Sequence, residues 1–247
     1  MIKPAPLHPQ TASKTIGKIF NTPVVVVGKT WLPITQFIIW GFLTWQSSRK
    51  HPQRPMREHL LIGAGSMTVI LGSEWGHNLA HAAAARLVEK PMDALRITLG
   101  MPLCVYHEID DLDVAPREHI IRALGGPVFN GLLLGLMRLL RPLTSQNSIA
   151  REIADAGVGM NLFLSTVSLV PIPGIDGGPI LKWGLVAAGR TPIEADAAVM
   201  QVNKIAGLGL GVAAGAAFKK KRRFVGALLA MFSALSFAIG FGWLKEQ

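Results

Sequence analysis

Two histidines stand four positions apart in an apolar stretch of this chain, and an aspartate follows much later. They are His77 and His81, within residues 73–81, and Asp176, within a Pro-Gly-Ile-Asp-Gly-Gly turn at residues 173–178. Residues at positions i and i+4 lie on one face of a helix, one turn apart. Two imidazoles so placed, with one carboxylate from elsewhere, make a three-ligand zinc site with an open fourth position. The three residues therefore predict a zinc site of the catalytic type.

The residue that follows the first histidine is Asn78, where a metalloprotease helix of the H-E-x-x-H type carries its glutamate base. An amide can hydrogen-bond a water or a substrate, but it cannot take up a proton. Glu74 lies about 60° around a helix from His77 and roughly 4.5 Å back along its axis. It therefore shares a face with both histidines. We expect Glu74 to act as the base, to bind the metal as an extra ligand, or to hold a histidine ring.

The composition of the chain is that of a membrane protein. Of its 247 residues, half are hydrophobic and only 16% are charged, and the mean hydropathy is +0.37; a soluble domain carries about 25% charged residues. The net charge of +10 comes from short basic clusters between apolar runs, which favours a membrane topology signal over nucleic-acid binding. The single cysteine, Cys104, excludes an intrachain disulfide and a cysteine-based zinc site.

The apolar runs predict an all-α membrane bundle of about six transmembrane helices, because each span needs roughly 20 apolar residues. Residues 1–20 are expected to form a flexible tail, and residues 21–247 a membrane domain. A small β-hairpin around Gly100 is expected after the histidine helix. The first run reads either as one helix or as a short strand-like run followed by a helix. The expected spans are residues 23–45, 59–88, 119–140, 154–188, 203–218 and 224–244.

The loops between these runs suggest an orientation. If the spans alternate, the basic loops at residues 49–57, 138–151 and 219–223 fall on one side, which the positive-inside rule makes cytoplasmic. The lysines near the N-terminus oppose this assignment. The short chain, without a large extramembrane domain, favours a multi-pass protein of a bacterial inner membrane.

Three blocks of the sequence resemble the site-2 protease family, the intramembrane zinc metalloproteases of the peptidase M50 type. The first block is the histidine segment, which continues past His81 with small residues and Ala-Arg-Leu. The second is Gly-Gly-Pro…Asn at residues 125–130, and the third runs from Asn161 to the aspartate motif ending at Gly178. The blocks follow the family order and cover about residues 60–185. Asn130 and Asn161 are expected to be polar partners between helices.

The resemblance admits two registers for the histidine helix. In the preferred register, His77 and His81 are the ligands and Asn78 replaces the family's glutamate. In the other register, Gly76-His77 is the family's Gly-His pair, so that Glu74 is the glutamate and Ser73 replaces the first ligand.

The resemblance implies hydrolysis of peptide bonds in or near transmembrane segments of membrane proteins. Zn2+ held by His77, His81 and Asp176 would polarise the attacking water, with Glu74 and Asn78 as the catalytic candidates. The substrate would enter as an extended strand beside the hairpin of residues 94–106. Because Asn78 cannot act as a base, the alternative is a catalytically silent relative that keeps the fold and metal site and binds membrane-protein partners. The expected surroundings are a lipid bilayer and a transmembrane substrate or partner, with no nucleic acid.

Overall fold

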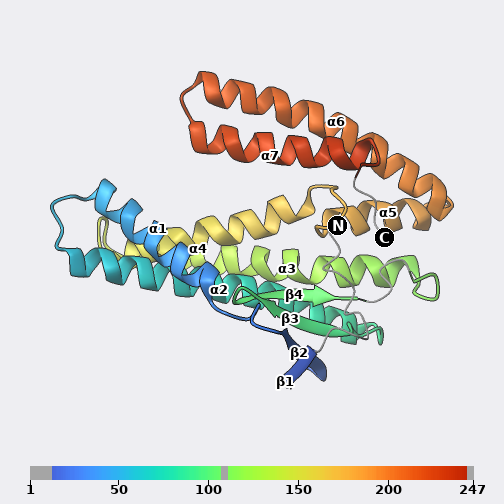
Figure 1. Cartoon of the computed structure of the whole chain (residues 1–247), viewed down its shortest axis with the longest axis horizontal. Coiled ribbons are helices and arrows are strands. Elements are labelled where there is room, and N and C mark those ends of the chain that lie inside the picture. The colour runs from blue at the N-terminus through green and yellow to red at the C-terminus, as the bar shows by residue number, and fades with distance from the viewer. Residues whose placement is uncertain (1–12, 107–110, 244–247) are drawn as a thin grey trace. The chain divides into compact units, whose positions relative to one another are not determined.

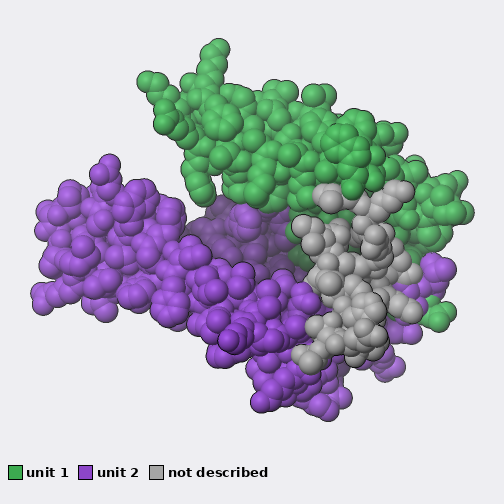
Figure 2. Space-filling model, viewed as in Figure 1, with its two compact units in different colours: residues 1–6, 113–123, 169–247 green, residues 7–112, 124–168 purple. Residues whose placement is uncertain are grey.

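The computed structural model describes residues 13–106 and 111–243, and it consists mainly of helices with one small sheet (Figure 1). The chain divides into two compact units (Figure 2). Among the described residues, unit 1 comprises 113–123 and 169–243, and unit 2 comprises the remainder. The boundary between the units falls within the long helix α3, Pro116–Leu140, whose first residues belong to unit 1.

The sheet of unit 2 has four strands in the order β1-β2-β3-β4. The outer pairs are antiparallel, and β2 pairs in parallel with β3. The predicted hairpin around Gly100 is confirmed, and Leu99 and Gly100 form its turn with positive φ angles of 52° and 83°. The strands are β1 (Ser13–Ile19), β2 (Thr22–Val27), β3 (Ala94–Thr98) and β4 (Met101–Val105).

The N-terminal part of the chain forms strands before its first helix. The expectation of a flexible tail was wrong for residues 13–19, which form a strand that pairs with β2. Thr22–Val27 is rich in β-branched residues, which favour strands, and its side away from β3 is open for pairing. Residues 1–12 lie outside the described residues. Of the two readings of the first apolar run, the strand followed by a helix is correct, since β2 precedes α1, Ile34–Lys50.

The sheet packs on the end of the histidine helix α2, Met56–Leu87. Val24 and Leu95 from the sheet and Ala82 from α2 form a buried cluster with Met92. A buried cluster of this kind fixes the faces of both elements. It therefore holds strand β4 beside the segment of α2 that carries the two histidines.

The helices of unit 2 are α1, α2, the larger part of α3, and α4, Ile149–Thr166. Helix α2 packs against both α1 and α4. Trp40 of α1 donates a hydrogen bond from Nε1 to the carbonyl oxygen of Leu60 on α2, at 3.2 Å. Helix α4 begins at Ser148, whose hydroxyl accepts from the amide of Arg151 at 3.1 Å, as an N-cap serine does. A short 3-10 turn, Arg141–Leu143, connects α3 to α4.

Unit 1 contains α5 (Gly177–Ala187), α6 (Pro192–Lys219) and α7 (Arg223–Gly240), after the 3-10 turn Val167–Leu169. Helix α6 begins in a complete capping box between Thr191 and Glu194. Helices α6 and α7 pack along each other, and the hydroxyl of Ser233 donates to the carbonyl of Gly207 at 2.6 Å. Asn203 of α6 donates to the carbonyl of Pro171 at 2.7 Å, which ties the aspartate turn to this unit.

Within residues 13–106 and 111–243, three helical segments are long and apolar enough to cross a membrane: Pro116–Leu143, Pro192–Lys219 and Arg223–Gly240. Large apolar side chains on them are widely exposed, including Leu132 at 73%, Ile205 at 72% and Phe224 at 74%. Such surfaces suit contact with lipid rather than with water. The count of six spans stays a prediction.

Candidate metal centre

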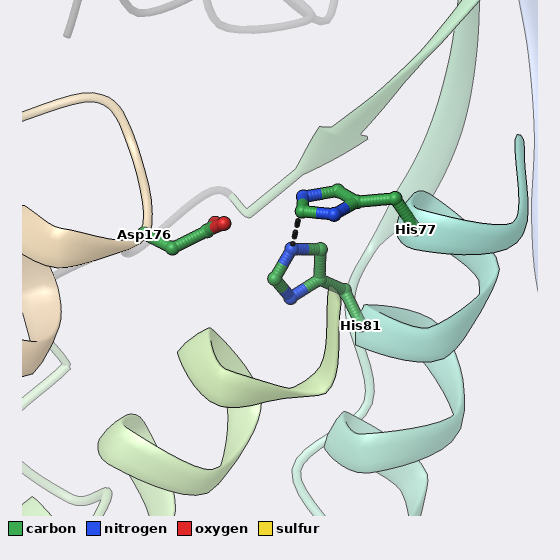
Figure 3. A group of neighbouring side chains, drawn as sticks. All are labelled: His77, His81 and Asp176. Carbon is green, nitrogen blue, oxygen red and sulfur yellow. Dashed lines mark hydrogen bonds between the residues drawn. The ribbon is translucent and has the colours of Figure 1, made fainter. Parts of the chain in front are cut away.

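The two histidines of unit 2 meet at their ring nitrogens. Helix α2 runs without a break through His77 and His81, and both side chains are 7% exposed. The rings meet edge to face, and the two Nε2 atoms are 3.1 Å apart (Figure 3). The spacing of four residues therefore places the two imidazoles on one helix face, as predicted.

The separation of the two Nε2 atoms fits a shared zinc ion. Zinc binds imidazole nitrogens at about 2.0–2.1 Å in tetrahedral geometry. Two nitrogens on one such ion are about 3.3 Å apart, and the structure has them at 3.1 Å. The pair can thus converge on a single ion without a change of backbone.

A buried hydrogen bond holds the ring of His77. The Nδ1 atom of His77 lies 2.6 Å from Oδ1 of Asn130 on α3. An amide oxygen only accepts, so this contact places the ring proton on Nδ1 and leaves Nε2 as the ligand atom. Asn130 is itself held, since its amide nitrogen donates to Oδ1 of Asn161 at 2.7 Å, and Asn161 donates to the hydroxyl of Ser73 at 2.8 Å. The prediction that Asn130 and Asn161 link helices is confirmed.

This chain of bonds gives a testable result. Asn130 and Asn161 are completely buried, so removing one amide leaves its buried partner without a hydrogen bond. We expect Asn130→Ala to lower zinc affinity about 10- to 100-fold, the usual cost of losing the partner of a histidine ligand. Competition with a chelator measures the dissociation constant. Ser233→Ala is the control, because Ser233 is also buried but bonds to the carbonyl of Gly207, between α6 and α7. Equal losses in the two variants would contradict the assignment.

Gly126 of α3 lies close to both histidine rings. A Cβ atom placed there would lie 2.5 Å from Cε1 of His77 and from Nε2 of His81. Real Cβ contacts do not reach this distance, so the rings would have to move. The glycine of the second sequence block thus allows close approach of α3 to the ligands.

We expect Gly126→Ala to lower zinc affinity about tenfold or more, because overpacking typically costs about 1–3 kcal/mol. Gly131→Ala is the matched control: it lies on the same helix, and a Cβ atom there meets nothing within 4 Å. Zinc titration of both variants provides the measurement. Wild-type affinity in Gly126→Ala would show that the rings can relocate freely.

Asn78 links the candidate base to the sheet. Its amide nitrogen donates to the backbone carbonyl of Glu74 at 2.9 Å and lies 3.4 Å from the carboxylate atom Oε1. Its Oδ1 accepts from the thiol of Cys104 on β4 at 3.2 Å. Asn78 is buried, and Glu74 is half-buried. The contact with Cys104 was not predictable from the sequence, because it depends on strand pairing and on the packing of the sheet on α2.

The aspartate of the third block lies in unit 1, directly before α5. Asp176 has helical backbone angles, and its side chain makes no capping hydrogen bond. The turn before it is tight: a Cβ atom on Gly177 would lie 2.3 Å from the carbonyl oxygens of both Leu169 and Val170. Only glycine fits there. Figure 3 draws Asp176 with the two histidines, and all three carry atoms of the kind that bind zinc.

The chain is similar in sequence to one curated protein. No protein-family model matches the sequence. A curated protein of Methanocaldococcus jannaschii, named "Putative zinc metalloprotease", is 35% identical over 86 residues; the match covers 35% of this chain and 44% of that protein. The chain therefore spans less than half the length of this relative.

Among solved structures, a site-2 protease from Methanocaldococcus jannaschii matches with a TM-score of 0.56. The match covers 96% of this chain and 97% of that chain, at 13% sequence identity. At this identity it shows the fold, and the curated relative adds a likeness in sequence to a zinc metalloprotease. The chain thus has the fold of a site-2 protease and resembles that family of membrane-embedded zinc metalloproteases.

Proposed function

We propose that this protein is a site-2-protease-like intramembrane zinc metalloprotease that binds one Zn2+ through His77, His81 and Asp176. The observation that carries the proposal is the 3.1 Å approach of the two Nε2 atoms, with Asn130 holding the His77 ring. Asp176 would supply the carboxylate, a role supported by its place in the aspartate motif. Zinc bound there would polarise the attacking water.

The register with His77 and His81 as ligands is supported by the surroundings of Ser73. The hydroxyl of Ser73 donates to the carbonyl of Val69 at 2.9 Å and accepts from Asn161. It is therefore used within the helix packing, and it is 1% exposed. This leaves the two imidazoles as the pair of α2 side chains suited to a metal.

In the proposed reaction, Glu74 removes a proton from the attacking water and delivers it to the amine nitrogen of the cleaved peptide bond. Asn78 is a positioning residue, because its amide nitrogen faces the Glu74 carboxylate. The substrate would bind as a strand beside β4, which is an edge strand of the sheet and packs on α2. Main-chain hydrogen bonds to an edge strand recognise an extended peptide without regard to its sequence.

A second candidate function is favoured by Asn78 itself. Its oxygen accepts from Cys104 and its nitrogen donates to Glu74, so its amide is engaged on both sides. A chain that carries an amide in place of a base is suited to keep fold and metal and to bind membrane-protein partners without cleaving them. For both functions we propose a multi-pass protein of a bacterial inner membrane.

The test is cleavage of peptides containing a transmembrane segment by the purified full-length chain in detergent. If the protein is a protease, we expect cleavage fragments when it is present. The fragments should be absent when the chelator 1,10-phenanthroline is added and should return when Zn2+ is added back. About one zinc per chain without cleavage of any member of a broad substrate panel would favour the silent relative. Absence of bound zinc would overturn both versions of the metal site.

A further inference from the structure

A hollow lies in unit 2, at the ends of the helices that carry its basic loops. It has a volume of about 610 Å³ and lies between α1, α2 and α4. Its apolar wall includes Leu43 and Ile62, and its polar wall includes Ser47 and Ser66. Arg49 and Lys50, both exposed, stand at its rim. It continues into a smaller hollow of about 210 Å³ that shares Lys50.

The hollow has an excess of positive charge. Four basic and two acidic side chains line the two joined parts. Both carboxylates are paired, Glu152 with Arg54 at 2.5 Å and with His51 at 3.2 Å, and Asp155 with Arg141 at 2.5 Å. The remaining positive charge lies on the rim and on Arg151.

Arg151 adds a donor inside this region. Its terminal nitrogen donates to the carbonyl of Thr144 at 2.7 Å. Its Nε atom is buried and has no hydrogen-bond partner among the residues that the structure describes. A buried donor of this kind is costly unless an acceptor arrives. An anion in the hollow would supply one.

The surface beside the hollow is apolar in the manner of a lipid-facing helix. Along α1, the side chains of Phe37, Ile38 and Trp45 are 65%, 65% and 58% exposed, and the helix ends in Arg49 and Lys50. Apolar contacts followed by basic side chains match a phospholipid, whose acyl chains end in a charged headgroup. The loops at 49–57 and 138–151 also meet here, since Arg54 bonds to Glu152 and to the carbonyl of Asn147.

We propose that this hollow binds the phosphate headgroup of an anionic membrane phospholipid. The rim cations Arg49 and Lys50 attract the phosphate, and Arg151, which lines the smaller part of the hollow, donates to it. The acyl chains lie along the exposed apolar face of α1. The inference depends on membrane residence of the chain and is independent of the zinc site.

The experiment is lipid binding to the full-length protein in detergent, measured by native mass spectrometry. The probes are dihexanoyl phosphatidylglycerol, phosphatidylcholine with the same chains, and inorganic phosphate. We expect one phosphatidylglycerol to bind and phosphatidylcholine to bind at least about tenfold more weakly. The double variant Arg49→Gln, Lys50→Gln should weaken phosphatidylglycerol binding about 30-fold, because each surface cation contributes roughly a fivefold factor to the binding of an anionic lipid.

The matched control is Lys219→Gln, Lys220→Gln, which removes the same charge from the exposed basic cluster at the end of α6. It should leave phosphatidylglycerol binding unchanged. If both double variants weakened phosphatidylglycerol binding equally, the binding would come from general attraction between the basic protein and the anionic lipid, and the proposal would be overturned. Equal affinity for phosphatidylcholine would overturn it as well, and so would inorganic phosphate that binds as tightly as the lipid. Binding should persist in His77→Ala, so that failure of the zinc site is distinguishable from failure of this one.

Discussion

His77→Ala should abolish zinc binding by the full-length protein, from about one zinc per chain to near zero. The imidazole supplies a direct ligand, and its loss leaves one histidine and one carboxylate, fewer than the three protein ligands of a catalytic zinc site. The loss should exceed the roughly 10- to 100-fold weakening expected when only the partner of a ligand is removed. Elemental mass spectrometry on detergent-purified protein gives the zinc content directly.

His51→Ala is the matched control for this experiment. His51 lies in the loop between α1 and α2, and its Nε2 atom is 3.2 Å from a carboxylate oxygen of Glu152. It precedes the histidine pair of α2 by more than twenty residues. It should retain full zinc content. His81→Ala should behave like His77→Ala, because the two Nε2 atoms converge on the same point. Zinc retained at full stoichiometry in His77→Ala would refute the ligand assignment in both registers. Zinc lost in His77→Ala but retained in His81→Ala would favour the register with Glu74 and Ser73, in which His77 is still a ligand.

The histidine pair was predictable because its geometry is local. Four residues on one uninterrupted helix fix the relative placement of two side chains whatever the rest of the fold does. The tight turn before Asp176 was similarly visible, because Gly177 is the residue that a close backbone approach requires. The hairpin after α2 was predictable from its strand-forming residues and Gly100.

The network around the pair could be predicted only by type. Asn130 and Asn161 are polar residues in apolar helices, and such residues find partners on neighbouring helices. Which partner each one finds depends on the packing of α2, α3 and α4, which no local pattern encodes. The bond from Asn130 to His77, which fixes the ligand nitrogen, therefore emerged only from the structure.

The sheet shows the same limit more strongly. Strand β2 pairs in parallel with β3 across almost seventy intervening residues, as Val24 opposite Leu95 illustrates. Pairing at such distance depends on the whole fold rather than on either segment. For that reason the contact of Cys104 with Asn78 could not be predicted from the sequence.

Glu74→Gln should lower cleavage about 10²- to 10⁴-fold while leaving zinc content unchanged. The substitution keeps the size of the side chain and its hydrogen bond with Asn78, but it removes the capacity to accept a proton. The measurement is the initial rate of cleavage of a transmembrane peptide beside zinc content from the same preparation. Glu58→Gln is the control, since it makes the same chemical change in the first turn of the same helix.

The two readouts separate the three roles assigned to Glu74. If Glu74 is the base, the Glu74→Gln variant cleaves more slowly at full zinc content. Its pH profile also lacks the acidic limb, because that limb reports protonation of the essential base. An extra ligand loses zinc together with rate. A residue that only holds a histidine ring changes zinc affinity modestly and keeps the pH profile. Full activity in Glu74→Gln would remove Glu74 from the reaction, and with Asn78 unable to take up a proton the chain would then lack a base on this face of α2.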